Sequence, residues 1–304
     1  MNDVPVFARH ETFHPRYGWF KKCYDAVTCD EHIFTREDAT VVLGVGKNMV
    51  QSIRYWGTAF KILEESSVTS RAQRSTGFGI SEFGKNLLGE NGWDPYLEDP
   101  ASLWLLHWFL LKDPCKATVW KFTFNEFHRD SFTSEDIFHS LREHVESSYP
   151  KTTVKDSSLQ KDINCVLRMY VDSFNHRQVK EDSIDCPFTD LSLIKQEGSA
   201  KRFSFNYGKK NNLPNDIILA TCLDYIANAG HNAKTISLTN LLHDQNSPGM
   251  LFKLTESVLF EAVERGIGDD KRIVLSDSSG LVQLSFKEDP SILADNLIRD
   301  HYRD

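Results

Sequence analysis

One short segment constrains the fold more than any other, because it is apolar on almost every side. Within residues 101–112, only Ser102, His107 and the terminal Lys112 are polar. A helix that is apolar all round must be covered by other elements on every face. Its longest apolar run, residues 103–111 with His107 inside it, is far shorter than the roughly 20 residues that span a membrane. We therefore expect a central helix inside a globular protein, with His107 as a core side chain.

Composition sets outer limits on the class of protein. A chain of 304 residues is long enough for two or three small cores. Its formal net charge of -8 argues against a uniformly basic coat for nucleic acid, although one domain can still carry a basic face. The six cysteines form no CxxC pair, and no basic segment followed by an apolar one opens the chain. We expect a cytoplasmic protein with reduced thiols.

The N-terminal third has the spacing of a helix-turn-helix unit. Apolar residues at helical spacing predict a helix over residues 17–27. Thr35, three residues before Asp38, predicts a capped second helix through residue 43. Two glycines in residues 44–46 permit a tight turn, and residues 47–64 are expected to form a longer third helix. This order is typical of a winged helix-turn-helix domain.

Polar residues spaced by three and four predict a DNA-contacting face on the third helix. These residues are Lys47, Gln51, Arg54, Thr58 and Lys61. Gln and Arg match adenine and guanine edges in the major groove, and the two lysines suit phosphates. A polar, glycine-ended stretch follows, in which Arg71 and Arg74 are expected on a wing that reaches the backbone or minor groove. The alternative is a solvated amphipathic helix in a protein-binding domain.

The opening motif matches a metalloprotease pattern. His10 and His14 stand in an HExxH sequence, which on a helix binds zinc with the Glu as general base. Pro15 follows directly and disfavours helix geometry at His14. The side chains of His10, Glu11 and Arg16 together could handle a proton and a phosphate. We favour instead a hydrogen-bonded N-terminal arm tied to the first core.

The remaining two thirds are expected to be mainly helical. Residues 118–127 fit a strand or a helix, and a capping sequence at residues 132–136 begins another helix through Glu146. Three helices and a hairpin follow in the C-terminal third, at residues 216–229, 237–243, 250–265 and 273–286. The fold class is therefore mainly α (α+β), with a winged-helix domain over residues 1–90, a helical connector over 91–190 and a second winged-helix-like domain over 191–304.

The charge of the second unit differs from that of the first. Its candidate recognition helix sets Glu256, Glu261 and Glu264 against Lys253 and Arg265, a net charge of -1 (two minus three). Carboxylates repel phosphates, so this unit is expected to pack or to bind a partner protein. A basic run precedes it and is either a second electrostatic surface or a solvated loop: Lys195, Lys201, Arg202, Lys209 and Lys210.

Several segments together resemble one bacterial family, the SspB-type proteins associated with DNA phosphorothioation. The segments are residues 9–19, 43–48, 53–56, 94–111 and 181–187. The first contains His-Glu-Thr-Phe followed by Arg16 and Trp19, and leaves His14 outside the pattern. Because these segments run from near the N-terminus into the last third, the resemblance covers most of the chain.

The resemblance implies a component of a DNA phosphorothioation system that binds double-stranded DNA. It implies partners of three kinds: a cysteine desulfurase, an ATP-pyrophosphatase-like protein and an ATPase. It also implies nicking of one DNA strand, which would allow sulfur to be installed and would use Mg²⁺ or Mn²⁺. Two groups of carboxylates are candidates for such an ion: Asp94 with Glu98 and Asp99, or Asp182 with Asp185. The alternatives are a non-enzymatic DNA-binding adaptor that docks the same partners and, third, a zinc peptidase.

Overall fold

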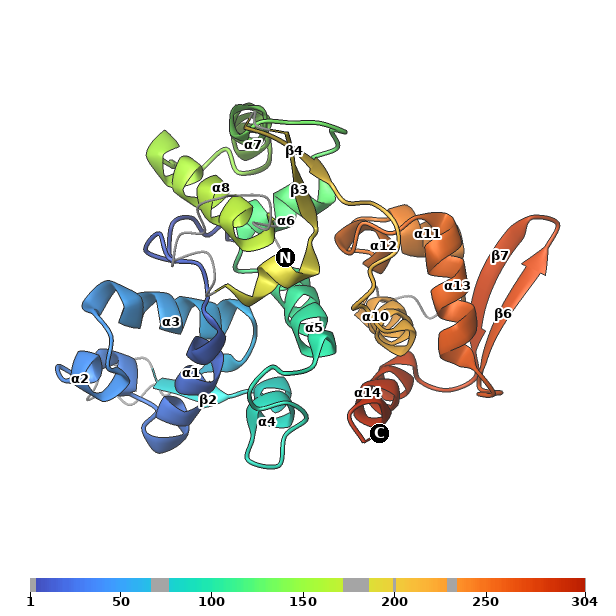
Figure 1. The fold of residues 1–304 in the computed structure, drawn as a ribbon, viewed down its shortest axis with the longest axis horizontal. Helices are drawn as coiled ribbons and strands as arrows, with labels where there is room; N and C mark the ends of the chain where they lie inside the picture. Colours follow the sequence, from blue (N-terminus) through green and yellow to red (C-terminus); the bar gives the residue numbers. More distant parts are fainter. Residues whose placement is uncertain (1–3, 67–76, 172–185, 199–200, 229–233, 304) are drawn as a thin grey trace.

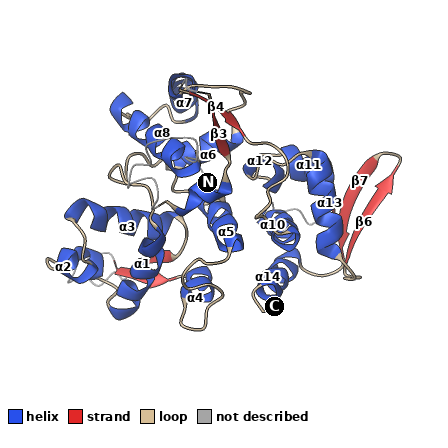
Figure 2. Cartoon of the chain, in the orientation of Figure 1, coloured by secondary structure: helices blue, strands red, loops and turns tan. Residues whose placement is uncertain are grey.

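The computed structural model describes residues 4–66, 77–171, 186–198, 201–228 and 234–303, and these residues are mainly helical with small sheets (Figures 1 and 2). This confirms the predicted mainly α (α+β) class. No helix in the described ranges is long and apolar enough to cross a membrane.

The central element is α5 (Pro100–Leu111), which lies between the N-terminal and C-terminal groups of helices in Figure 1. Pro100 occupies its first turn, where no backbone N–H is needed, and the Asp99 carboxylate accepts from the N–H of Ala101. His107 is fully buried, with Nδ1 2.8 Å from the Tyr170 hydroxyl and Nε2 3.1 Å from the Leu251 carbonyl. Burial lowers the pKa of His107 to about 3, so it is a neutral core side chain, as expected.

The N-terminal group follows the predicted order of elements. Its members are α1 (Tyr17–Cys29), the 3₁₀ turn η1 (Ile33–Thr35), α2 (Ala39–Leu43), α3 (Lys47–Ala59), the antiparallel strands β1 (Leu63–Ser66) and β2 (Gly77–Ile80), and α4 (Glu82–Leu88). Two details of the prediction were wrong. Thr35 does not cap α2, because its hydroxyl donates to the His32 carbonyl and Asp38 is the N-cap residue. The third helix ends at Ala59 instead of residue 64, and Leu63 already belongs to β1.

The middle of the chain is helical and ends beside α5. It contains α6 (Thr118–Asn125), α7 (Ser134–Ser148), α8 (Asp156–Tyr170) and the 3₁₀ helix η2 (Pro187–Leu191). Residues 118–127, left open between strand and helix, are helical over α6. Thr133 and Asp136 form a complete capping box at the start of α7, as predicted.

The C-terminal group contains the predicted helices and hairpin with several additions. The strands β3 (Ile194–Glu197) and β4 (Arg202–Phe205) precede α10 (Asn215–Asn228), β5 (Thr235–Ser237), α11 (Leu238–His243), α12 (Pro248–Leu251), α13 (Glu256–Ile267), β6 (Ile273–Ser278), β7 (Leu281–Phe286) and α14 (Pro290–His301). The last sheet has the order β5-β7-β6. The predicted helix over residues 250–265 is two helices, because Lys253 between them has a φ of 54°.

Contacts cross both predicted domain boundaries. The N-terminal arm, residues 4–15, lies on the middle group, where the Val6 N–H donates to the Thr118 hydroxyl at 2.8 Å. Val171 at the end of α8 forms a parallel bridge with Ile194. Buried apolar side chains from all three groups form one cluster. The boundaries at residues 90 and 190 stay a prediction.

Candidate nucleic-acid interface

Two glycines place α3 against the rest of the N-terminal group. Gly44 ends α2 with a φ of 63°, a conformation that residues with a Cβ rarely adopt, and Gly46 is the N-cap residue of α3. Gly46 provides no side-chain cap, and no acidic residue stands in the first turn of α3. No acidic side chain of α3 therefore neutralises the positive end of the helix dipole. This end favours an anion from another molecule.

The two faces of α3 differ sharply in exposure and chemistry. Val50, Ile53 and Trp56 are buried in the core. On the outer side, Lys47 is exposed, and the other predicted residues within the helix, Gln51, Arg54 and Thr58, are partly exposed. The helix contains one Lys, one Arg and no carboxylate, a net charge of +2.

Arg54 is partly exposed on the outer side of α3. Its guanidinium has no ion pair or hydrogen bond with any other residue that the structure describes. The Arg54 carbonyl accepts from the Thr58 hydroxyl at 2.9 Å, so Thr58 is turned along its own helix. We call Lys47, Gln51 and Arg54 the α3 face. Its amide and guanidinium groups can each form two hydrogen bonds to one partner, and α3 itself carries no carboxylate that would bind them.

Lys61, the fifth predicted member, does not lie on this face. It follows the end of α3 with a φ of 57°, and its ammonium donates to the carbonyls of Phe109 and Lys112 at 2.5 and 2.6 Å. These carbonyls are at the C-terminal end of α5, where a cation is favourable. Burial lowers the pKa of Lys61 to about 8. The prediction was wrong because the helix ends before Lys61, which turns inward. Arg71 and Arg74 lie outside the described residues.

The opening motif forms a buried contact between α8 and α3. Residues 8–12 are turns and α1 begins only at Tyr17, so the two histidines of the motif do not share a helix. His10 is fully buried, and its Nε2 lies 2.6 Å from Asp162 Oδ1 on α8. The same carboxylate accepts from the N–H of Ala8. The expected arm tied to the core is therefore present, and the described residues contain no group of three or more His, Cys, Asp or Glu side chains placed to hold a metal.

The arm around His10 contacts α3 directly. The His10 ring stacks on Trp56 at a centroid distance of 6.0 Å, and the Trp56 indole N–H donates to the Phe13 carbonyl at 3.0 Å. Glu11, another catalytic candidate, is exposed on the turn. Arg16 is the N-cap residue of α1 and lies over the Trp19 ring. The structure thus does not bring His10, Glu11 and Arg16 together at an exposed site.

The acidic candidates have separate roles. Asp94 is buried and accepts hydrogen bonds from the N–H groups of Glu98 and Asp99 and from the Ser102 hydroxyl, all between 2.6 and 2.9 Å. Asp99 caps α5 and also lies 3.1 Å from Nε2 of His301. Both carboxylates are therefore used in capping the apolar helix. Of these three residues, Glu98 alone is exposed, and the other candidates, Asp182 and Asp185, lie outside the described residues.

Glu98 lines a cavity of about 310 Å³ where α1, α5 and η2 meet. Asp190 lines the same cavity and accepts from the Tyr17 hydroxyl at 2.8 Å, and desolvation together with this bond raises the pKa of Tyr17. Two carboxylates therefore line one cavity, and Mg²⁺ in proteins is commonly held by one or two carboxylates with several waters. Asp190 and Tyr17 were not predicted as site residues, since only the fold places them near Glu98.

Comparisons with known proteins agree with this architecture. A family model described as "Protein of unknown function (DUF4007)" matches residues 7–302. Two solved structures, described as "Magnesium ion-bound SspB crystal structure" and "SspB crystal structure", are each 35% identical to this chain with a TM-score of 0.92. Each alignment covers 99% of this chain and 88% of the other. Among curated proteins, none matches the chain. The chain therefore belongs to the DUF4007 family, as a relative of SspB.

Proposed function

We propose that this protein is a cytoplasmic, DNA-binding component of a DNA phosphorothioate modification system and that it contacts duplex DNA through the α3 face. The relationship to SspB supports the first part, because the sequence resembles SspB-type proteins of such systems. The observation that carries the second part is the Arg54 guanidinium, which pairs with no other residue that the structure describes and lies on a helix without carboxylates. A surface helix with positive charge and with side chains that can form two hydrogen bonds to one base suits base edges and phosphates.

The proposed binding mode is that of a winged helix. The turn between α2 and α3 would place α3 in the major groove, with its uncapped N-terminus toward a phosphate. The strands β1 and β2 would carry the wing, and Arg71 and Arg74 remain the proposed wing contacts. Lys61 is not part of this proposal, because its ammonium caps α5.

Affinity for a short duplex tests this assignment. The Q51A/R54A variant should bind about tenfold or more weakly at moderate salt, because each good base or phosphate contact contributes about 1–3 kcal/mol. Both side chains are partly exposed, so the variant should fold normally. Lys271→Ala, at an exposed lysine beside β6, is the matched control for the loss of one positive charge. Equal affinity of Q51A/R54A and wild type would reject the α3 face.

We further propose that the protein nicks one strand with Mg²⁺ or Mn²⁺ held at the Glu98–Asp190 cavity. One structural relative is described as magnesium ion-bound, and the two carboxylates fit a hydrated cation. Such an ion would stabilise charge on the scissile phosphate. The test is conversion of supercoiled plasmid to open circle by purified protein, with metal and with chelator. Glu98→Gln should abolish metal-dependent nicking while leaving duplex affinity intact; equal nicking by that variant would remove this cavity from the proposal.

The alternative is a non-enzymatic adaptor, and α13 supplies an observation in its favour. This helix carries three Glu and one Arg, a net charge of -2 (one minus three). Lys253, counted with it in the sequence prediction, is fully buried and precedes the helix. An acidic helix surface suits a protein partner better than DNA. Retention of a cysteine desulfurase, ATP-pyrophosphatase-like or ATPase component by wild type, lost in a Glu256→Lys variant, together with the absence of nicking, would support the adaptor.

A further inference from the structure

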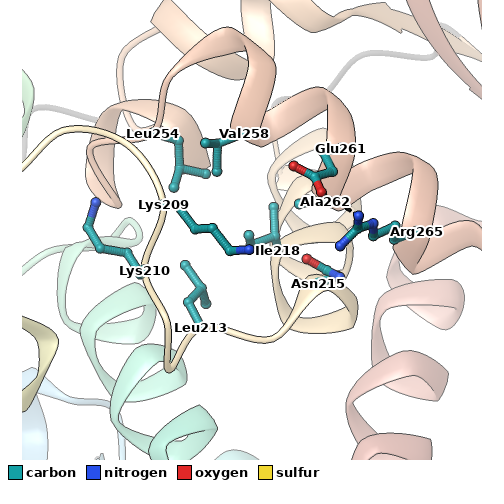
Figure 3. A pocket seen from close by; sticks show the side chains of 10 residues that line it. All are labelled: Lys209, Lys210, Leu213, Asn215, Ile218, Leu254, Val258, Glu261, Ala262 and Arg265. Atoms are coloured by element: carbon teal, nitrogen blue, oxygen red, sulfur yellow. Dashed lines mark ion pairs between the residues drawn. The ribbon is translucent and has the colours of Figure 1, made fainter.

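A small pocket in the C-terminal group is lined by positively charged side chains that have no part in the functions proposed above. It lies between the segment before α10 and the helices α10 and α13 (Figure 3). Its charged lining residues are Lys209, Lys210, Arg265 and Glu261, a net charge of +2 (three minus one). Leu213, Ile218, Leu254, Val258 and Ala262 supply apolar walls. This local charge of +2 contrasts with the formal net charge of -8 for the whole protein.

Several donors of this pocket have no partner among the described residues. Lys209 is exposed and makes no ion pair or hydrogen bond there, and the same holds for the side-chain amide of Asn215. Arg265 uses one nitrogen in a 2.6 Å ion pair with Glu261. In Figure 3 the Lys209 ammonium and the Arg265 guanidinium point toward the same space, and the Asn215 amide lies between them with its oxygen on the Lys209 side. Two cationic donors therefore face this space, beside one amide group.

Close packing of two helix ends creates this convergence. Asn215 begins α10 and Gly266 is in the last turn of α13. A Cβ on Gly266 would lie only 2.9 Å from the Asn215 carbonyl oxygen, so glycine permits this approach. Asp216, the acidic residue in the first turn of α10, has one carboxylate oxygen 2.7 Å from His301 and accepts from the Ile217 N–H at 2.9 Å with the other. This carboxylate offsets the positive end of the α10 dipole, so the positive charge at the pocket comes from the side chains that line it.

A buried lysine in the pocket lining is held by backbone carbonyls. Lys210 is 7% exposed, and its ammonium donates to the carbonyls of Gly208 and Lys253, at 2.7 and 3.3 Å. In Figure 3 this ammonium points away from the space between Lys209 and Arg265. Burial lowers the pKa of Lys210 to about 8, and an anion in the pocket would favour its charged form.

We propose that this pocket, formed by Lys209, Arg265 and Asn215, binds a phosphate group. The room for a ligand is about 30 Å³, which exceeds the ~10–15 Å³ that one water needs and suits a compact anion rather than a base or a sugar. A phosphate presents acceptor oxygens in several directions, which matches the Lys209 and Arg265 donors that face the pocket from different elements. Its source is either a DNA backbone or a free phosphate compound. The site is separate from the α3 face.

The test is titration of the full-length protein with sodium phosphate at constant ionic strength, followed by calorimetry and thermal unfolding. Phosphate should bind wild type and raise its Tm, while Lys209→Gln and Arg265→Gln should weaken binding about tenfold or more, the effect of losing one charge-assisted contact. Lys271→Gln is the control, because this exposed lysine lies outside the pocket. Both pocket side chains are exposed, so neither variant should lose its fold.

Two outcomes would overturn the inference: wild-type phosphate affinity in both pocket variants, or stabilisation of wild type by sodium glutamate equal to that by phosphate. The source is identified in the Q51A/R54A background, where the α3 face is disabled. Displacement of phosphate by a short duplex assigns DNA, and displacement by a nucleoside monophosphate alone assigns a free compound. Because the readout is phosphate binding, failure of DNA binding at α3 does not affect this test.

Discussion

The buried contact between His10 and Asp162 makes a quantitative prediction about how the N-terminal arm is held. His10→Ala removes the ring whose Nε2 lies 2.6 Å from the Asp162 carboxylate, in a pair with side-chain exposures of 0% and 2%. Among the described residues, the carboxylate would keep only the Ala8 N–H as a donor. Removing one partner of a buried pair typically costs about 3–5 kcal/mol, because the other charge stays buried without compensation. We expect a loss of this size in the free energy of unfolding at neutral pH.

The pH dependence of this loss provides an internal check. Burial raises the pKa of Asp162, whereas the hydrogen bond from His10 opposes that rise. An acid with a raised folded pKa contributes stability at low pH that is lost as pH rises through the folded value. Without His10 the pKa of Asp162 should rise further, so the variant should lose more stability than wild type as pH rises above the unfolded value of about 4. The destabilisation should therefore be smaller at the acidic end.

Urea unfolding monitored by tryptophan fluorescence measures both effects, since Trp56 and Trp120 surround the His10 ring. Glu11→Ala is the matched control in the same arm, because Glu11 is exposed and its loss should change stability by less than about 0.5 kcal/mol. The double variant with Asp162→Ala should be less destabilised than the sum of the single changes, because the orphaned carboxylate is gone. A His10→Ala protein as stable as the Glu11→Ala control at pH 7 would refute the reasoning.

Three further changes test other buried or partly buried cations. Lys253→Met should leave stability unchanged or raised at pH 7 and should flatten its increase above pH 7, because burial lowers the pKa of Lys253 to about 7; urea unfolding from pH 6 to 9 checks this. His301→Gln should lower the free energy of unfolding in urea more at pH 6 than at pH 9, by at most about 1 kcal/mol, because the bond to Asp216 raises the pKa of this partly exposed His301 and its stabilisation is lost as pH rises. Lys61→Met should destabilise the protein by about 1–3 kcal/mol in urea, since two carbonyls at the end of α5 lose their donor, while leaving DNA affinity unchanged.

Strong local patterns predicted much of the fold. The uniformly apolar segment gave α5 within a residue at each end, and the capping sequence at Thr133 gave the start of α7. Short strands such as β5 were missed, because three residues carry too little periodicity to distinguish a strand from a loop. The end of α3 was also missed, because the apolar spacing continues through Leu63, although the backbone leaves the helix at Phe60.

The candidate sites show where sequence spacing stops being informative. Lys61 has the right spacing for the α3 face, but the chain turns before it and a tertiary contact holds its ammonium. Asp94 and Asp99 are close to Glu98 in sequence, yet their carboxylates accept from backbone N–H groups. Of the three, only Glu98 lines the cavity that also contains Asp190. Asp190 faces that cavity from a segment about ninety residues away, a proximity that only the folded chain creates. Burial and backbone direction, which spacing alone does not encode, decide these cases.

The most direct test of the central claim is the salt dependence of duplex binding for wild type, Lys47→Ala and Arg54→Ala. If the α3 face contacts phosphates, the logarithm of the binding constant should fall linearly with the logarithm of salt concentration, and each lost phosphate contact should reduce the slope by about 0.9. A base contact from Arg54 would instead weaken binding to the preferred sequence more than to random DNA. We predict a shallower slope for Lys47→Ala and weaker binding for Arg54→Ala. Slopes and affinities identical to wild type in both variants would contradict DNA binding through α3.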